Sequence, residues 1–269
     1  MNARWLLCLL AAAGLAAAES PPWRLSPSIE RQIARPERVF TQGLVFADGL
    51  LYESSGLYGR SALLVHRVGF DRLRPVARRP LAERYFGEGL AAVGSKLYQL
   101  TWREGEALVW RRADLEPAGR RRYLGEGWGL CYDGRRLVMS DGTPRLRFLD
   151  PADFAERGAV TVRRAGEPLG ALNELECIAG YVWANVWRTP WVVVIDPADG
   201  RVRAEIDFSA LVARHAGDPQ ADVLNGLAWD PQVHGLLVTG KNWPVLYQVR
   251  LRGPEAARAL LPKGLWAGP

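Results

Sequence analysis

The chain has 269 residues and a formal net charge of +6, from 35 Lys and Arg residues against 29 Asp and Glu. The basic residues are mostly arginines spread along the chain, whereas a nucleic-acid surface gathers them in one patch, so we expect no nucleic-acid partner. The length allows one large core, since all-β domains of about 200 to 250 residues are commonly single.

The first segment in chain order reads as an export signal. Arg4 precedes the apolar run WLLCLLAAAGLAAA, which ends in small residues before Glu19. This run is too short for a membrane-spanning helix, which needs about 20 apolar residues. We therefore expect residues 1–18 to be a cleaved signal peptide and residues 19–269 to form a single domain. The mature protein would be periplasmic or secreted, with no membrane attachment after cleavage.

Five similar segments follow along the chain, about 40 to 50 residues apart. Each has a polar or aromatic residue, then Gly or Glu, then Leu. The segments are FTQGL from Phe40, YFGEGL from Tyr85, GEGWGL from Gly125, LNELE from Leu172 and VLNGL from Val223. The shared leucines are Leu44, Leu90, Leu130, Leu175 and Leu227.

Each segment begins a unit of four short strands. A Gly-containing turn separates the first strand from a second such as LLYES or KLYQL. An alternating third strand such as ALLVHRV and a more polar fourth such as PVARRPL follow. Four-stranded units of about 40 to 50 residues are typical of propeller blades. The sequence therefore predicts an all-β fold, a five-bladed β-propeller with four-stranded antiparallel blades.

The two ends of the chain complete this pattern. The fifth unit has no fourth strand after Leu251, and the segment PSIERQIARP, from Pro27 to Pro36, has no unit of its own. We expect this N-terminal segment to supply the outer strand of the last blade, which would remove an open sheet edge. The tail from Gly253 to Pro269, with the helical pattern EAARALL, is an appendage to which the sequence assigns no role.

The first strands of a propeller line a central channel, so equivalent positions form rings. The residues before the shared Gly or Glu are Gln42, Glu88, Trp128, Asn173 and Asn225. Packing between blades would favour small or branched apolar residues at this position. Binding pockets instead combine aromatic side chains with a few polar groups, so this ring predicts a binding site.

A second ring comes from the ends of the second strands. Its members are Glu53, Trp102, Asp141, Trp187 and Lys241. Trp102 and Trp187 each end a strand beside arginine, and we expect both in the pocket. Asp141 is expected in a turn with the glycine that follows it, and Glu53 and Glu126 could each cap a turn. The tryptophans that we assign to the core are Trp110, Trp183 and Trp229.

Glu88 is the only acid in the first ring. Its neighbours Phe86 and Leu90 are apolar and its ring partners are uncharged, an environment that raises a carboxyl pKa by desolvation. Such a carboxyl can accept and donate a proton near neutral pH, although Glu88 could instead cap a turn. The glycines on either side, Gly87 and Gly89, would let the strand run close to a substrate.

Cysteines and histidines give no sign of a metal site. Cys131 and Cys177 follow the signal segment, and we expect two buried free thiols, with a disulfide as the alternative. The three histidines lie outside the rings and have no ligand spacing with the cysteines. His66 lies in a third strand and is expected at the surface.

The motifs FTQGL, ESSGLYGRS, YFGEGL, KLYQLTW, GWGL, SDGT, LNELE, VWANVW, VLNGLAWD and VTGKNWP occur in this order. Together they resemble the plant and bacterial, papaya-type glutaminyl-peptide cyclotransferases, the glutamine cyclotransferase family of five-bladed propellers. The resemblance implies an enzyme that converts the N-terminal glutamine of peptides or proteins to pyroglutamate and releases ammonia, without a cofactor. We expect it to act as a monomer.

The resemblance also implies roles for individual residues. The family's acid, asparagine and lysine fall on Glu88, Asn173 and Lys241, which we expect to be catalytic. Substrate-binding residues would be Phe40, Gln42, Phe86, Trp102, Trp128 and Trp187, to which the first ring adds Asn225. The residues themselves also indicate a mechanism. Glu88 would move a proton from the α-amine to the departing nitrogen, and Asn173, Asn225, Gln42 or Lys241 would donate to the oxyanion, with binding of a peptide carbonyl as the alternative for Lys241.

Two other functions remain open from the sequence. One is a metal-dependent, lactonase-like propeller in which Glu88, Asn173 and Asn225 bind calcium through oxygen atoms. The other is a periplasmic propeller without catalytic activity that binds a peptide or a sugar through its tryptophans.

Overall fold

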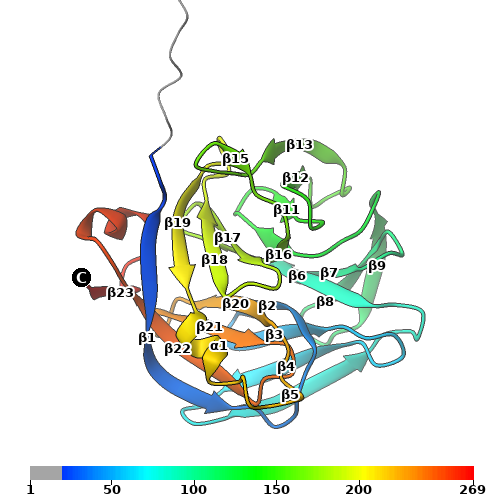
Figure 1. Cartoon of the computed structure of the whole chain (residues 1–269). Coiled ribbons are helices and arrows are strands. Elements are labelled where there is room, and N and C mark those ends of the chain that lie inside the picture. Colours follow the sequence, from blue (N-terminus) through cyan, green and yellow to red (C-terminus); the bar gives the residue numbers. More distant parts are fainter. Residues whose placement is uncertain (1–19) are drawn as a thin grey trace, which may run out of the picture.

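The computed structural model describes residues 20–269, which form an all-β protein (Figure 1). The expected signal peptide, residues 1–18, lies outside the described residues. Three sheets have four antiparallel strands each. They are β2 (Thr41–Ala47), β3 (Leu50–Ser55), β4 (Ala62–Val68) and β5 (Leu73–Pro80); β6 (Gly87–Val93), β7 (Lys96–Thr101), β8 (Glu106–Arg111) and β9 (Pro117–Arg122); and β10 (Leu130–Tyr132), β11 (Leu137–Met139), β12 (Arg145–Leu149) and β13 (Glu156–Thr161).

The other long strands belong to one larger sheet. Its order is β16 (Leu172–Ile178), β17 (Tyr181–Val186), β18 (Trp191–Ile195), β19 (Val202–Asp207), β1 (Trp23–Ala34), β22 (Val245–Arg252), β21 (Gly235–Gly240) and β20 (Leu224–Asp230). β1 runs parallel to β19 from Trp23 to Leu25 and then antiparallel to β22 from Ser26 to Ala34. The N-terminal segment thus pairs with the fifth unit, as expected, and also joins that unit to the fourth.

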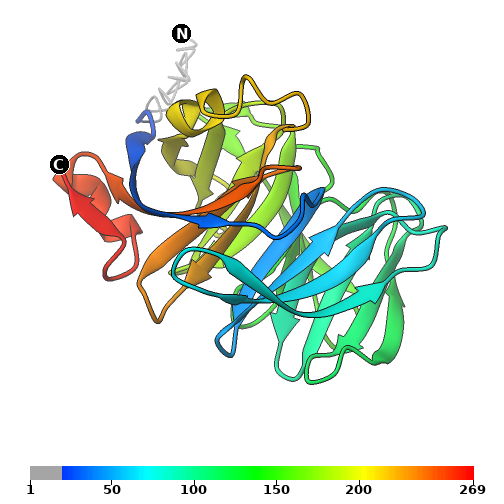
Figure 2. The same cartoon turned by 90° about the horizontal axis from the view of Figure 1, so that it is seen from below.

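The smaller elements lie between and after these strands. They are the hairpin β14 (Arg163–Arg164) and β15 (Glu167–Pro168), the helix α1 (Ser209–Ala213), the 3-10 helix η1 (Glu255–Leu260) and β23 (Trp266–Gly268). Figure 2 shows the C-terminal elements beside β1 and β22, and β23 pairs with β22 in parallel. Ala257 and Leu265 are fully buried, so the tail is packed onto the core. Among residues 20–269, no helix has the length and hydropathy needed to cross a bilayer.

The first strands of the five units form a closed ring. β2 contacts β6, β6 contacts β10, β10 contacts β16, β16 contacts β20, and β20 returns to β2. The shared leucines are all buried: Leu44, Leu90, Leu130, Leu175 and Leu227. The sheets spread outward from this ring (Figure 1), so equivalent positions of the repeats are brought together around one centre.

Glycines in the first strands permit this close approach. A Cβ atom on Gly43 would lie 2.6 Å from Leu90 N, and one on Gly89 would lie 2.5 Å from Leu130 N. A Cβ atom on Gly87 would likewise lie 2.6 Å from Ser55 O. We expected glycines here to make room for a substrate, but the backbone of a neighbouring strand occupies that space.

Glu174 stands where the other units have glycine. Its Oε1 accepts a hydrogen bond from Leu44 N at 3.2 Å and its Oε2 accepts one from Leu227 N at 2.9 Å. The carboxyl group is fully buried and connects β16 to β2 and β20. A glutamate at this position therefore holds three first strands together through backbone N–H groups.

The packing confirms that the three assigned tryptophans belong to the core, but it contradicts the surface position expected for His66. Trp183 and Trp110 are buried, and Trp229 packs against the same core as Trp183. His66, expected at the surface, has only 2% of its area exposed. The reason is that β4 is buried continuously from Ala62 to His66, so both faces of the strand are covered.

The expectation of two free thiols is wrong, because Cys131 and Cys177 form a disulfide. Cys131 lies on β10 and Cys177 on β16, and contact between these first strands brings their Cα atoms to 5.5 Å. This separation lies within the usual range for a disulfide. The bond joins the third unit to the fourth.

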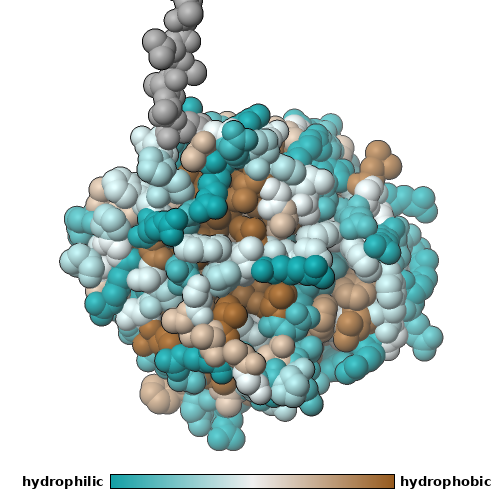
Figure 3. Space-filling view, viewed as in Figure 1, coloured by the Kyte–Doolittle hydropathy of each residue, from teal (hydrophilic) through white to brown (hydrophobic). Residues whose placement is uncertain are grey.

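The surface in the view of Figure 3 is predominantly hydrophilic, with hydrophobic residues in separate patches. Several arginines take part in exposed ion pairs, such as Arg78 with Glu37 and Arg111 with Asp114. The dispersed arginines of the sequence are therefore part of a mixed-charge exterior.

Candidate functional site

A cavity of about 290 Å³ is lined by residues from the first strands and from the ends of the second strands. Its lining residues are Phe40, Gln42, Leu57, Phe86, Glu88, Trp102, Trp128, Asn173, Trp187 and Lys241. Residues from all five units are thus brought to one site. Five of the lining side chains are aromatic, and one carboxyl, one amine and two amides face them.

Asn225 is the one predicted site residue that does not line this cavity. Its Nδ2 donates to Thr41 O at 3.0 Å and to Gln42 Oε1 at 3.4 Å. The side chain therefore lies behind Gln42 and turns the Gln42 oxygen away from Glu88. Sequence reasoning placed Asn225 in the correct ring but not on the correct side of it.

Leu57 lines the cavity although the sequence did not single it out. It has φ of 86°, and Arg188 and Asn242, which follow Trp187 and Lys241, have φ of 64° and 60°. Residues other than glycine rarely adopt this left-handed conformation, which costs about 1–3 kcal/mol and persists where surrounding contacts impose it. An apolar residue after a glycine carries no polar or aromatic signal, so the repeat pattern did not identify it.

Glu88 is the acid of the cavity, with 4% of its area exposed. Its Oε1 accepts a hydrogen bond from Gln42 Nε2 at 2.8 Å. Burial raises the pKa of Glu88 well above its ordinary value; nearby Lys241 lowers it, while the charges of Glu126 and Glu104 raise it further. The Glu88 carboxyl can therefore exchange a proton closer to neutral pH than an exposed glutamate does.

Lys241 is the cation of the cavity. Its side chain is buried, and its Nζ lies 4.7 Å from the ring centroid of Phe40. Burial lowers the pKa of Lys241, and the charge of Glu88 acts in the opposite direction. Asn173 is also buried, and its backbone oxygen accepts a hydrogen bond from Ser140 Oγ at 2.7 Å. This bond fixes the end of β16 that carries the amide.

Edge-to-face contacts order the aromatic side chains. The ring of Phe86 lies 6.1 Å from that of Phe40 and 5.5 Å from that of Trp102, and Trp128 lies 5.4 Å from Trp187. Such contacts are favourable because the positive edge of one ring meets the negative face of the other. The cavity therefore has well-defined aromatic walls.

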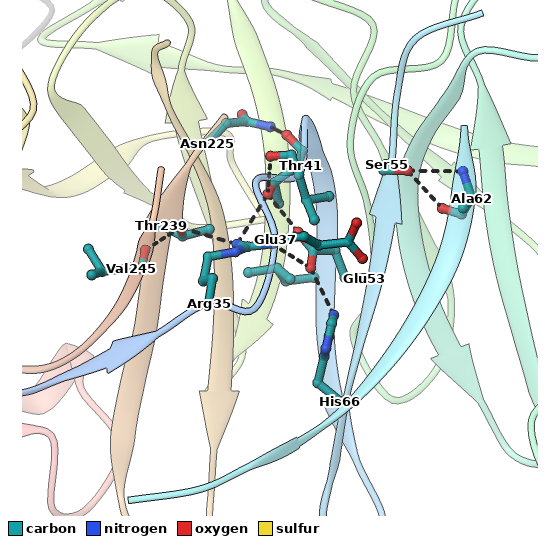
Figure 4. A network of polar contacts seen from close by, with 12 residues as sticks. Arg35, Glu37, Thr41, Glu53, Ser55, Ala62, His66, Asn225, Thr239 and Val245 are labelled. Carbon is teal, nitrogen blue, oxygen red and sulfur yellow. Dashed lines mark hydrogen bonds and ion pairs between the residues drawn. The ribbon is translucent and has the colours of Figure 1, made fainter. Parts of the chain in front are cut away.

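Two members of the second ring lie outside the cavity. Glu53 is fully buried and binds Arg35 through both oxygens, at 2.6 and 2.7 Å (Figure 4). Asp141 accepts hydrogen bonds from Thr143 N at 3.0 Å and from Thr143 Oγ1 at 2.5 Å, as expected of a turn residue. Glu53 belongs to a structural network and does not cap a turn.

No three His, Cys, Asp or Glu side chains come together as a potential metal-binding group anywhere in residues 20–269. The nitrogen and oxygen groups of the cavity are instead one carboxyl, one amine and two amides, together with indole N–H groups.

The family model described as glutamine cyclotransferase matches residues 3–251 of this chain. The chain belongs to the glutamine cyclotransferase family. A glutaminyl-peptide cyclotransferase of Arabidopsis thaliana is 38% identical over 221 residues, which are 81% of this chain and 68% of that protein. The crystal structure of Myxococcus xanthus glutaminyl cyclase matches with a TM-score of 0.79 at 42% identity. This match covers 86% of the present chain and 98% of the Myxococcus chain.

In this glutamine cyclotransferase, one acidic residue near the cavity escaped the sequence reasoning. Glu126 was treated only as a turn cap, but its Oε2 accepts hydrogen bonds from the indoles of Trp102 and Trp128. The available sequence signal was its position two residues before Trp128, a member of the first ring. That spacing alone does not reveal that the carboxylate also reaches a second sheet.

Proposed function

We propose that this glutamine cyclotransferase converts the N-terminal glutamine of peptides and proteins to pyroglutamate with release of ammonia, and that Glu88 is its general acid and base. The names of the relatives from Arabidopsis and Myxococcus support the reaction. The observation that carries the mechanism is the buried carboxyl of Glu88, which faces an aromatic cavity with its pKa raised.

The proposed reaction needs one proton carrier. The Glu88 carboxylate takes a proton from the α-amino group, whose nitrogen attacks the γ-carboxamide carbon and forms the ring C–N bond. The tetrahedral intermediate then loses its amide nitrogen, to which Glu88 returns the proton, and ammonia leaves. Acid–base catalysis of this kind contributes about 10² to 10⁴ in rate.

The other polar residues of the cavity would stabilise charge and orient the substrate. Lys241 and Asn173 are the proposed donors to the oxyanion of the tetrahedral intermediate. Gln42 donates to Glu88 and so favours the carboxylate form that begins the reaction. The aromatic side chains would hold amine and amide in contact, which matters strongly for an intramolecular attack.

The cavity volume suggests how much of a peptide enters. A space of about 290 Å³ lies just below the range of ligand pockets, which span roughly 300–1,000 Å³. We infer that the N-terminal glutamine enters and that the rest of the peptide stays outside. The site would then accept many sequences that begin with glutamine.

We also propose that residues 19–269 form one five-bladed β-propeller that acts as a monomer. The blades would be β2–β5, β6–β9, β10–β13, β16–β19 and a last one of β20, β21, β22 and β1. The closed ring of first strands supports this arrangement. Residues 1–18 would direct the chain to the periplasm or the exterior, where disulfides such as Cys131–Cys177 persist.

The test is release of ammonia from a dipeptide that begins with glutamine. The wild-type protein should release ammonia well above the spontaneous rate, with or without a chelator. Glu88→Gln should lose most of the rate, about 10²-fold or more, and still bind the dipeptide. Loss of activity with chelator would favour a metal-dependent enzyme, and binding without turnover by the wild type would favour a binding protein.

A further inference from the structure

We propose that Glu126 is a positioning residue that fixes two walls of the cavity, the indoles of Trp102 and Trp128, in the orientation that receives the substrate. The inference rests on the proposed function of this cavity. Glu126 itself does not line the cavity, so it would act through the two tryptophans.

The first observation is that a single oxygen atom holds both indoles. Glu126 Oε2 accepts from Trp102 Nε1 at 2.8 Å and from Trp128 Nε1 at 3.0 Å. Trp102 follows β7 and Trp128 precedes β10, so the two indoles come from different sheets. An indole has one N–H donor, and fixing that donor restricts rotation of the whole ring.

The second observation concerns the other oxygen of Glu126. Oε1 accepts a hydrogen bond from Arg103 Nε at 3.1 Å, and the guanidinium of Arg103 lies 3.6 Å from the ring centroid of Trp102. Trp102 is therefore held at its edge by the carboxylate and at its face by the cation. Arg103 also compensates the charge that Glu126 brings close to the cavity.

The ionised form of Glu126 suits this role. Burial acts to raise the pKa of Glu126, but hydrogen bonds from Trp128, Trp102 and Arg103 outweigh it and lower the pKa. Hydrogen bonds to a charged acceptor are roughly twice as strong as neutral ones. The two indoles are thus oriented by an acceptor that stays ionised at neutral pH.

Glu126 would also act on Glu88 through its charge. The charged groups that act on Glu88 are Lys241, which lowers its pKa, and Glu126 and Glu104, which raise it. Removing either acid should shift the acid limb of the kcat/KM profile to lower pH. Only removal of Glu126 should also release the indoles, because Glu104 instead accepts from Tyr58 OH.

The experiment compares the wild type with Glu126→Ala, Glu126→Gln and the control Glu104→Gln, measuring kcat and KM for a glutamine-initiated dipeptide across pH. Glu126→Ala should raise KM about tenfold or more, since hydrogen bonds to a charged group contribute about 1.5–3 kcal/mol. Glu126→Gln keeps an oxygen that can accept from both indoles, so its KM should be close to that of the wild type. Its acid limb should still be shifted to lower pH. Glu104→Gln should shift the limb and leave KM unchanged.

A double-mutant cycle tests whether the effect of Glu126→Ala on KM passes through the two indoles. In a Trp102→Phe/Trp128→Phe background the indole donors are gone, so Glu126→Ala should raise KM much less than it does in the wild type. An equal increase in both backgrounds would overturn the proposal, as would an unchanged KM in Glu126→Ala. If the wild type releases no ammonia, the proposed function fails; a normal KM in an active Glu126→Ala protein defeats only the role of Glu126.

Discussion

Lys241 supplies the positive charge that acts on the buried carboxyl of Glu88. Burial raises the pKa of Glu88, and Lys241 is the first charge that opposes this rise. In the proposed mechanism Glu88 is ionised when it takes the first proton, so Lys241→Met should raise its pKa and move the acid limb of kcat/KM to higher pH. The measurement is the pH profile of ammonia release, with the exposed Lys96→Met as control. A limb that stays in place or moves to lower pH would contradict this electrostatic role.

Individual site residues were predictable to the extent that the repeats align. Gln42, Glu88 and Asn173 occupy one ring position and all reach the cavity. Asn225 occupies the same position but bonds to Thr41 O, a choice of side-chain rotamer that no pattern of residues encodes. Leu57 enters the cavity through a left-handed turn, which the sequence does not indicate for leucine.

A buried ion pair connects the elements that meet where β1 ends. Arg35 follows β1 and binds Glu53 on β3, and its Nη1 also donates to Thr41 and Thr239, on β2 and β21 (Figure 4). The exposed fractions of the Arg35 and Glu53 side chains are 1% and 0%. The pair therefore joins the first and fifth units within the protein interior.

Removing one member of this pair should lower the free energy of unfolding. Glu53→Gln leaves the Arg35 cation buried without its counter-charge, which costs about 3–5 kcal/mol. Urea denaturation should show this loss of unfolding free energy. The matched control is Glu37→Gln at the exposed pair with Arg78, where a change of at most about 1 kcal/mol is expected. Similar losses in the two variants would contradict the assigned importance of burial.

Low pH should remove part of the stabilisation that Glu53 provides, because it protonates the carboxyl. Burial favours a higher pKa for Glu53, but Arg35 and His66 prevail and lower it from 4.5 to about 2. A carboxyl with a depressed pKa stabilises the folded state above its unfolded pKa, and this contribution is lost as the pH falls. The unfolding free energy lost in Glu53→Gln relative to wild type should therefore shrink between about pH 5 and pH 2. A difference that stays constant over this range would be inconsistent with an ionised Glu53.

At the level of elements, strand order was predictable from the repeat, but burial within a strand was not. An alternating strand such as β4 usually has one solvated face. His66 instead faces Glu53 Oε2 at 3.2 Å inside the protein. In a sheet that packs against neighbours on both faces, polar and apolar residues need not alternate between an exposed and a buried face. The pattern ALLVHRV therefore could not distinguish a surface histidine from a buried one.

At the scale of the whole molecule, the Cys131–Cys177 disulfide constrains two neighbouring units. It joins residues 46 apart in sequence, and sequence alone could not show that they meet, because the distance depends on how adjacent units pack. The Cys131→Ser/Cys177→Ser variant should lose about 2–4 kcal/mol of unfolding free energy. Because neither residue lines the cavity, its kcat should match that of the wild type. Reductant should destabilise the wild type but not the variant; equal sensitivity of both would refute the assignment.

The pairing of β1 with β22 has a consequence for the order of folding. Ile33 lies opposite Leu246, so β1 must wait for β22, which is synthesised much later. Contacts between such distant residues carry a large loop-closure cost and form slowly. Until β22 has been synthesised, the backbone N–H and C=O groups of β1 that bond to β22 lack these partners. Completion of the sheet that contains β1 and β22 is therefore a late event, and a chain released before Val245 would fold with an open sheet edge exposed to other molecules.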